Sequence, residues 1–183
     1  DAPGVTVTAT PALDPTRTLA TITFTDAPAT RIGTGEPAVL RRRLREIAWA
    51  ALAAEQVGAA RHCLEMTVEY TASRVQFGRP IGSFQAVKHL CAEMLLDLES
   101  ARAAALHAAA VAGGTLAEAA AVAKVCCSEA YVRIAADSLH VHGGLGFTWD
   151  HDAHLYLRRA RSSLHLFGDP RFHRERLARH LGL

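Results

Sequence analysis

The feature that most constrains the fold is a change of hydrophobic period near residue 36. Before that point, Val5 to Thr8 and Leu19 to Phe24 alternate apolar and polar residues, are rich in β-branched side chains and lie between prolines. This pattern is typical of strands, and we expect two strands of an antiparallel sheet. Two strands cannot bury a face alone, so either they pack on the following helices or the rest of their sheet is missing from this chain.

After residue 36 the period is about 3.6 residues, as in helices. Pro37 suits the first turn of a helix that we expect to run to about Ser73. Ser83 can cap a second helix, which we expect to continue through Ala112 to a pair of glycines. The apolar stripe of the first helix is predicted to contain Leu40, Leu44, Ile47, Ala51, Ala54 and Gly58.

Three further helices follow from local signals. Thr115 to Glu118 has the T-x-x-E form of a capping box and opens a helix that we expect to run to His142. A fourth helix is predicted for about residues 152–166, and Pro170 can start a short fifth one. The first three helices would be roughly 28 to 38 residues long, which is normal only in bundles. The predicted fold class is therefore mainly α, an antiparallel bundle of long helices preceded by two strands.

Composition excludes several classes of protein. The 183 residues include 20 Lys and Arg against 18 Asp and Glu, and 50% of the residues are apolar, which argues against intrinsic disorder. Near-neutral charge and only 6% aromatic residues argue against a nucleic-acid surface, although Arg41 to Arg43 is a basic run. No uncharged apolar run approaches the length of about 18 residues that a membrane span needs.

The beginning of the sequence and its cysteines bear on location. Asp1-Ala2-Pro3-Gly4 offers neither an initiating Met nor the basic start of a secretory signal, so we expect a cytoplasmic protein that is a processed, trimmed or partial piece of something longer. The cysteines contain no C-x-x-C pair, and we expect buried free thiols in a reducing compartment. These cysteines are Cys63, Cys91, Cys126 and Cys127.

Two histidines have a spacing that would let them share a metal ion. His151 and His154 have i, i+3 spacing, but no third ligand has a suggestive spacing. Surface histidines are therefore expected, and no metal site is predicted.

The most informative segment is the turn from Arg74 to His89, which reads RVQFGRPIGSFQAVKH. Two glycines and a proline break the helical pattern between two long helices. Arg74 lies near one helix end, and free backbone N–H groups are expected at the start of the next helix. That combination suits an anion.

Within this turn, R-x-x-F-G-x-x-I-x-x-F-Q resembles the helix-helix turn of the acyl-CoA dehydrogenase family of flavoenzymes. A second block agrees, because HVHGGLGF at residues 140–147 is similar to the family's Q-x-x-G-G-x-G-F/Y. Residues 155–161, LYLRRAR, resemble the L-x-R-D-A-R that follows it. Two ordered motifs, separated by a helix pair of the family's length, make chance similarity a poor explanation.

The resemblance covers residues 36–183 as the family's C-terminal helical-bundle domain and residues 1–35 as the end of its middle β domain. It implies FAD as the cofactor, held between subunits. One subunit holds the flavin ring, while the neighbour's C-terminal domain holds the pyrophosphate and adenosine end. The implied partners are acyl-CoA dehydrogenase subunits in a homo- or hetero-oligomer, and an acyl-CoA substrate in the full assembly.

The same resemblance implies which residues bind FAD. Arg74 would pair with the pyrophosphate, and the stretch from His140 to Gly144 would pass along the neighbour's dinucleotide, so both are expected on one subunit interface. His140 replaces the usual Gln, which keeps a hydrogen-bonding side chain but adds a titratable one. The implied cofactor-binding residues are Arg74, Gln76, Phe77, Gln85, His140, Gly143 and Gly144.

The family's reaction needs a carboxylate that removes the α-proton of an acyl-CoA while hydride leaves the β-carbon for the flavin. By the resemblance, the usual position of that base is Phe167 here. The alternative position on the first long helix is Ala48, beside Trp49. Neither Phe167 nor Ala48 can accept a proton, so both usual sources of the base are empty.

Three other carboxylates lie near these two positions in the sequence. Glu46 points about 200° around the helix from Ala48 and is a poor substitute. Glu55 lies on the same face as Ala48 but about 10 Å along the axis, and a hydrogen-bonded structural role competes with its role as a base. Asp169, followed by Pro170, favours a helix cap. The Asp169-Pro170 pair also replaces the family's flavin-contacting Thr-Ser pair.

Two functions remain open. The first is an acyl-CoA dehydrogenase of which this is the C-terminal part, with an unrecognised base. The second is a catalytically silent subunit or fragment that builds an interface, either completing the FAD site of an active partner or binding no flavin. The resemblance is to the heteromeric branch that oxidises steroid side-chain CoA thioesters, where one of two unlike subunits lacks the glutamate. Phe167 and Ala48 favour the second function.

Overall fold

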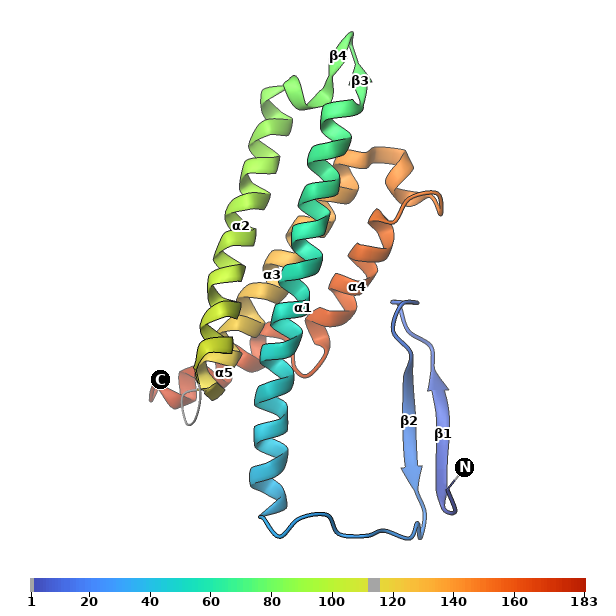
Figure 1. Ribbon diagram of the computed structural model, residues 1–183, viewed down its shortest axis with the longest axis vertical. Coiled ribbons are helices and arrows are strands. Elements are labelled where there is room, and N and C mark those ends of the chain that lie inside the picture. Colours follow the sequence, from blue (N-terminus) through green and yellow to red (C-terminus); the bar gives the residue numbers. More distant parts are fainter. Residues whose placement is uncertain (1, 112–115) are drawn as a thin grey trace.

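A helical bundle and a two-stranded hairpin make up the molecule (Figure 1). The computed structural model describes residues 2–111 and 116–183. The elements in chain order are β1 (Val5–Thr10), β2 (Leu19–Phe24), α1 (Pro37–Ser73), β3 (Val75–Gln76), β4 (Arg79–Pro80), η1 (Ile81–Ser83), α2 (Gln85–Ala110), α3 (Leu116–His142), η3 (Gly143–Phe147), α4 (Ala153–His165) and α5 (Pro170–His180). The mainly α fold class is therefore confirmed.

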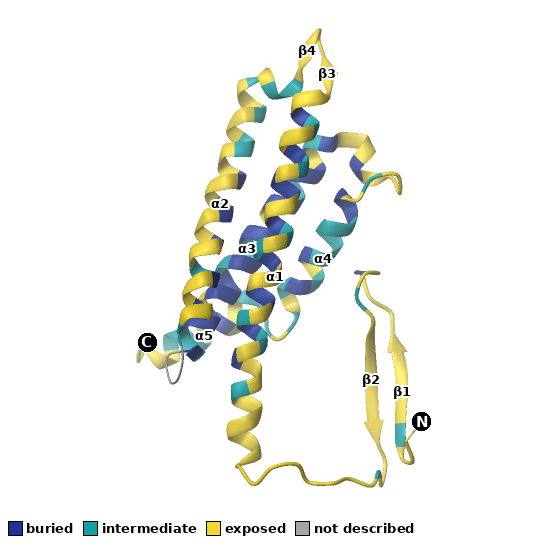
Figure 2. Ribbon diagram, viewed as in Figure 1, coloured by how far each residue is buried: buried dark blue, intermediate teal, exposed yellow. Residues whose placement is uncertain are grey.

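The two N-terminal strands form an antiparallel hairpin, as predicted. Val5 pairs with Phe24 and Val7 with Ile22, which places these four apolar side chains on one face of the ribbon. Val7, Ile22 and Phe24 remain exposed. The hairpin stands beside the bundle with most of its length uncovered (Figure 2). Its apolar face is thus not buried by the following helices.

α3 is the central helix of the bundle and contacts α1, α2, α4 and α5. Alanines occupy most of its buried positions, including Ala120, Ala123 and Ala135. Small side chains allow neighbouring helices to approach closely, so the core is dense although it contains few large residues. Within α3, Tyr131 and Ile134 are the largest fully buried apolar side chains.

The buried face of α1 is not the predicted one. Leu40, Leu44 and Ile47 are exposed, as are the smaller residues of that stripe. The helix instead buries a face that includes Trp49, Leu52 and several polar residues. These polar residues have partners on α3: Gln56 Nε2 donates to Ser128 Oγ at 3.1 Å, and Thr67 Oγ1 lies 2.8 Å from Ser138 Oγ. Satisfied polar groups can be buried, and a pattern based on hydrophobicity alone selects the wrong face.

The predicted cap of the second helix is also wrong. Ser83 belongs to η1, and its hydroxyl donates to the carbonyl oxygen of Pro80 at 2.7 Å. Phe84 precedes α2 in an extended conformation and makes no side-chain cap. α2 ends at Ala110, while the expected helix end at Ala112 and the capping box at Thr115 lie outside the described residues.

α4 begins and ends within a residue of its predicted bounds, and α5 begins at Pro170 as predicted. Asp169 caps α5 by accepting a hydrogen bond from the Phe172 N–H at 2.8 Å, as expected. All four cysteines are free, but Cys91 and Cys126 are only half-buried rather than buried. Within residues 2–111 and 116–183, no helix is long and apolar enough to cross a membrane.

Candidate functional site

A groove of about 570 Å³ lies where the end of α1 meets the end of α3. It brings together two motifs that are about 65 residues apart in the chain, the turn after α1 and the glycine pair after α3. Its lining residues are Tyr70, Arg74, Gln76, Ile81, Val141, His142, Gly143, Gly144 and Leu145.

Arg74 is held at the groove by the backbone of the turn that follows α1. Its N–H donates to the carbonyl oxygen of Tyr70, and its own carbonyl accepts from the Ile81 N–H, both at 2.8 Å. The guanidinium is exposed and has no hydrogen bond or ion pair within the part of the chain that the structure describes. An unpaired cation on a fixed backbone suits an anionic ligand.

The glycine pair ends α3 and opens the short 3₁₀ turn η3. Gly143 adopts a positive φ of 57°, a conformation that favours glycine. A Cβ placed on Gly143 or Gly144 would meet no atom within 4 Å. Both residues therefore leave the backbone open to close approach by a ligand along this side of the groove.

His142 and Tyr70 form part of the groove; His142 falls within the predicted stretch from His140 to Gly144, whereas Tyr70 lies outside the sequence motifs. The two rings stack with centroids 4.4 Å apart. His142 Nδ1 lies 2.7 Å from the carbonyl oxygen of Ser138, while Nε2 is buried without a partner among the described residues. Burial lowers the pKa of His142, the Ser138 hydrogen bond raises it and the charge of His151 lowers it, and the net direction is downward.

The remaining residues implied for FAD binding are outside this groove. Phe77 is 91% exposed at the tip of the β3–β4 hairpin, with a positive φ of 52°. Its ring lies edge-on to Phe84. Gln85 and His140 are exposed and do not line the groove. The end of α3 thus turns His142, rather than His140, toward the groove.

The turn between α4 and α5 contains Phe167, which has a positive φ of 60° and is 51% exposed. Trp49 of α1 is buried, and its indole Nε1 donates to the carbonyl oxygen of Phe167 at 2.9 Å. The ring of His173 lies edge-on to this indole, with centroids 4.8 Å apart. Burial lowers the pKa of His173 to about 4, so its ring is neutral near pH 7.

Glu55 is held by two arginines. Arg17, in the connection between β1 and β2, donates to it at 2.9 Å, and Arg159 of α4 also approaches to 2.9 Å. Asp14 joins this cluster through an ion pair with Arg159 at 3.7 Å. Glu55 therefore ties the hairpin connection to the bundle. Its side chain is 41% exposed.

Glu46 is buried, and its carboxylate pairs with Arg42 at 3.8 Å and Arg43 at 3.9 Å on the same helix. His154 is buried as well, which corrects the expectation of a surface residue, and Trp149 lies edge-on to its ring. Within the described residues, no group of three or more His, Cys, Asp or Glu could hold a metal ion.

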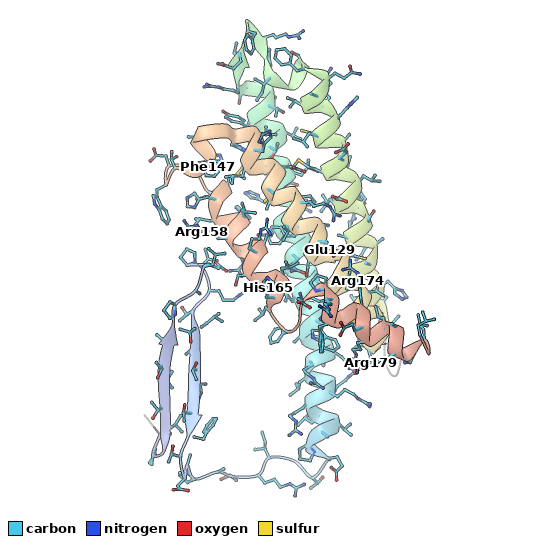
Figure 3. All side chains as sticks on the ribbon, turned by 180° about the vertical axis from the view of Figure 1, so that it is seen from behind. Glu129, Phe147, Arg158, His165, Arg174 and Arg179 are labelled. Carbon is cyan, nitrogen blue, oxygen red and sulfur yellow. The ribbon has the colours of Figure 1, made fainter. Side chains whose placement is uncertain are left out.

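Figure 3 labels side chains on the face that carries α4 and α5. Phe147, at the end of η3, lies on the same side as Arg158 of α4. Arg174 of α5 lies against Glu129 of α3, with a nitrogen-to-oxygen distance of 2.6 Å. This ion pair joins the last helix to the central helix of the bundle.

Residues 48–182 match the family model of the acyl-CoA dehydrogenase C-terminal domain. The chain belongs to the acyl-CoA dehydrogenase family. The acyl-CoA dehydrogenase IpdE2 of Mycobacterium tuberculosis is 43% identical to it over 159 residues, which are 87% of this chain and 46% of that protein. The chain thus spans about half the length of this relative.

Two solved structures of family members are similar along nearly the whole chain. The ChsE4-ChsE5 complex from Mycobacterium tuberculosis has a TM-score of 0.89 and 32% identity, over 99% of this chain and 50% of that chain. The Tcur3481-Tcur3483 steroid ACAD has a TM-score of 0.88 and 31% identity, over 100% of this chain and 50% of that chain. These similarities confirm the family and the fold.

Proposed function

We propose that this chain is a part or subunit of an FAD-dependent acyl-CoA dehydrogenase, which desaturates the α,β bond of an acyl-CoA thioester. In this proposal the chain contributes one side of the FAD site and carries no catalytic base. The observation that carries the proposal is the single groove shared by Arg74, Gln76 and the Gly143-Gly144 pair. The rest of the site would come from residues outside this chain.

The groove residues fit the pyrophosphate end of FAD. Arg74 offers an unpaired guanidinium, whose fork of donors matches phosphate oxygens. The glycine pair leaves room for a dinucleotide because no Cβ covers the backbone, and the buried Nε2 of His142 is a polar atom without a partner among the described residues. Bound FAD would accept the hydride that leaves the β-carbon of the acyl chain. This chain's residues would bind and orient it.

The absence of a base in this chain is supported by the surroundings of its carboxylates. Phe167 and Ala48 occupy the two positions from which family members would supply the base, and neither side chain can take a proton. Glu55 is paired with two arginines, and Glu46 with two others. Both carboxylates are thus engaged in ion pairs with arginines of this chain.

The proposed partner is a further acyl-CoA dehydrogenase subunit that supplies the carboxylate. The ChsE4-ChsE5 complex supports a pair of unlike subunits, and the Tcur3481-Tcur3483 steroid ACAD supports a steroid side-chain CoA thioester as the substrate class. The cytoplasmic location remains a prediction, supported by the four free cysteines.

A second candidate function is an interface subunit that binds no flavin. The observation in its favour is Asp169, which stands where the family contacts the flavin but accepts the Phe172 N–H as a helix cap. The carboxylate oxygen that accepts this hydrogen bond is less available to contact a cofactor. FAD content of the intact assembly distinguishes the two candidates.

The test is to replace Arg74 by Ala and measure the FAD retained by the purified assembly from its absorbance. Loss of a charge-assisted contact worth about 1.5–3 kcal/mol should raise the dissociation constant for FAD by about 10- to 100-fold. Arg102→Ala is the matched control, because Arg102 is exposed on α2 and pairs with Glu99. Unchanged FAD retention in Arg74→Ala would refute the groove as the FAD site, and a wild-type assembly without FAD would favour the second candidate.

A further inference from the structure

Three rings form a stack beside the groove, in which Tyr70 and His142 line the groove and the His151 ring is tilted by 42° against that of His142. His142, the last residue of α3, lies between Tyr70 of α1 and His151 of the turn before α4. Its ring centroid is 4.4 Å from that of Tyr70 and 4.3 Å from that of His151, and the residue is 2% exposed. The stack therefore joins three segments of the chain at the point where the glycine pair leaves α3.

The hydrogen bonds of His142 determine which ring nitrogen carries its proton. A carbonyl oxygen can only accept, so the 2.7 Å contact with Ser138 O requires the proton on Nδ1. Nε2 then carries a lone pair, and it is buried without a partner among the described residues. A second proton would convert it to a buried N–H without an acceptor, which is unfavourable. The neutral ring is the form that fits this position.

The charged and titratable groups around the ring favour the same form. Tyr70 faces it from α1, His151 faces it from the turn before α4, and Arg74 lines the same groove. α3 contributes only the Ser138 carbonyl oxygen to its hydrogen bonds. Protonation of both histidines would bring two imidazolium rings within 4.3 Å of each other, and their repulsion would open the stack.

The glycine turn packs against the end of α3, including His142 itself. A Cβ placed on Gly146 would lie 3.1 Å from His142 Cβ and 3.0 Å from Leu139 Cδ1, so η3 folds back onto the end of α3. Gly143 and Gly144, which border the groove, lie between His142 and this contact. Because Gly143 directly follows His142 in the chain, a displacement of His142 also displaces the backbone of the glycine pair.

We propose that His142 is the positioning residue of the groove: its neutral ring holds the Gly143-Gly144 turn where FAD binds, and its protonation releases the turn and the cofactor. This inference rests on the proposed function, because it concerns the same site. Arg74 cannot produce such a pH dependence, since a guanidinium stays charged throughout the range in which proteins are folded.

The test measures FAD release from the intact assembly between about pH 8 and about pH 5, from the free flavin in an ultrafiltrate. In the wild type, the dissociation constant should rise about tenfold for each pH unit below the pKa of His142. His142→Phe keeps the stacked ring but cannot be protonated, so its dissociation constant should stay within about twofold over the range. His107→Phe, at an exposed position of α2, should behave as the wild type.

The outcomes separate this inference from the proposed function. A His142→Phe assembly that binds FAD with the wild-type pH dependence overturns the inference and leaves the proposed function standing. If that variant does not assemble, His142→Gln replaces it, and a flat profile supports the inference while a wild-type profile overturns it. A wild-type assembly that holds no FAD at any pH overturns the proposed function and this inference with it.

Discussion

At the scale of single residues, Lys124 brings a positive charge into the centre of the bundle. Its ammonium donates to Ser128 Oγ at 2.9 Å and to the carbonyl oxygens of Ser163 and Leu164 at 3.1 Å. The two carbonyls belong to the last turn of α4, where the helix dipole favours a cation. Three acceptors match its three donors, so the charge is retained although burial lowers the pKa of Lys124 to about 8.

This lowered pKa predicts a pH dependence of stability. Between about 8, the folded pKa, and the ordinary value of 10.5, the unfolded chain binds more protons, so the contribution of Lys124 to stability rises with pH. The free energy of unfolding of the wild type, relative to that of Lys124→Met, should therefore increase with pH by up to about 3 kcal/mol across this window.

Urea unfolding at several pH values measures that difference. The comparison with Lys124→Met is needed because burial raises the pKa of Cys63 and Cys127 to about 12, and these thiols lower stability with rising pH in both proteins. A difference that stays constant with pH would contradict the prediction.

At the scale of elements, the turn between α4 and α5 is anchored from several sides. Trp49 holds the carbonyl of Phe167, and Lys124 holds the two carbonyls just before the turn. Gly168 has a φ of 105°, and a Cβ on it would lie 2.5 Å from Phe172 Cδ1 and 3.2 Å from His173 Nε2. The strained conformation of Phe167 persists because the surrounding helices determine the path of the backbone.

Gly168→Ala should accordingly lower the free energy of unfolding by about 2 kcal/mol or more, through both the positive φ and the clash with Phe172. Gly58→Ala is the matched control, because Gly58 lies inside α1 and a Cβ there would meet no atom within 4 Å. That change should raise stability by about 0.5–1 kcal/mol. Denaturant unfolding measures both, and equal effects of the two substitutions would show that the turn is not constrained as described.

Local sequence signals were sufficient to predict the α-helices and the first two strands. They were insufficient to predict every helix cap or the buried face of α1. Pro37 and the glycine pair after His142 mark helix ends by backbone chemistry within a few residues. Ser83 was wrongly predicted to cap the second helix, because its hydroxyl donates to the carbonyl oxygen of Pro80 instead. The division of the chain at residue 36 into the end of a β domain and a helical domain stays a prediction.

At the scale of the whole molecule, the chain presents the groove of Arg74 at one end of the bundle and the turn of Phe167 between α4 and α5. We propose that neither supplies a catalytic base. The isolated chain, even with FAD added, should show no acyl-CoA dehydrogenation, because general-base catalysis contributes roughly two to four orders of magnitude to the rate.

Glu55→Gln and Glu46→Gln in the intact assembly should keep turnover within about twofold. Turnover is measured as the reduction of an artificial electron acceptor by an acyl-CoA.

FAD content and assembly must be measured alongside turnover, since Glu55 also ties Arg17 and Arg159 together. If either variant abolishes turnover while both properties are unchanged, this chain supplies the base and the proposal of a silent chain is wrong.

The sequence by itself determined the helical fold and the family, because helix ends and the R-x-x-F-G and H-G-G-x-G-F motifs are read within short stretches of chain. Only the tertiary structure decided which face of α1 is buried, that His142 rather than His140 lines the groove, and that Glu55 is paired. The physical reason is that these properties depend on contacts between distant residues. Gln56 meets Ser128 72 positions away, and Arg159 meets Glu55 104 positions away. Hydrophobic periodicity contains no information about such partners.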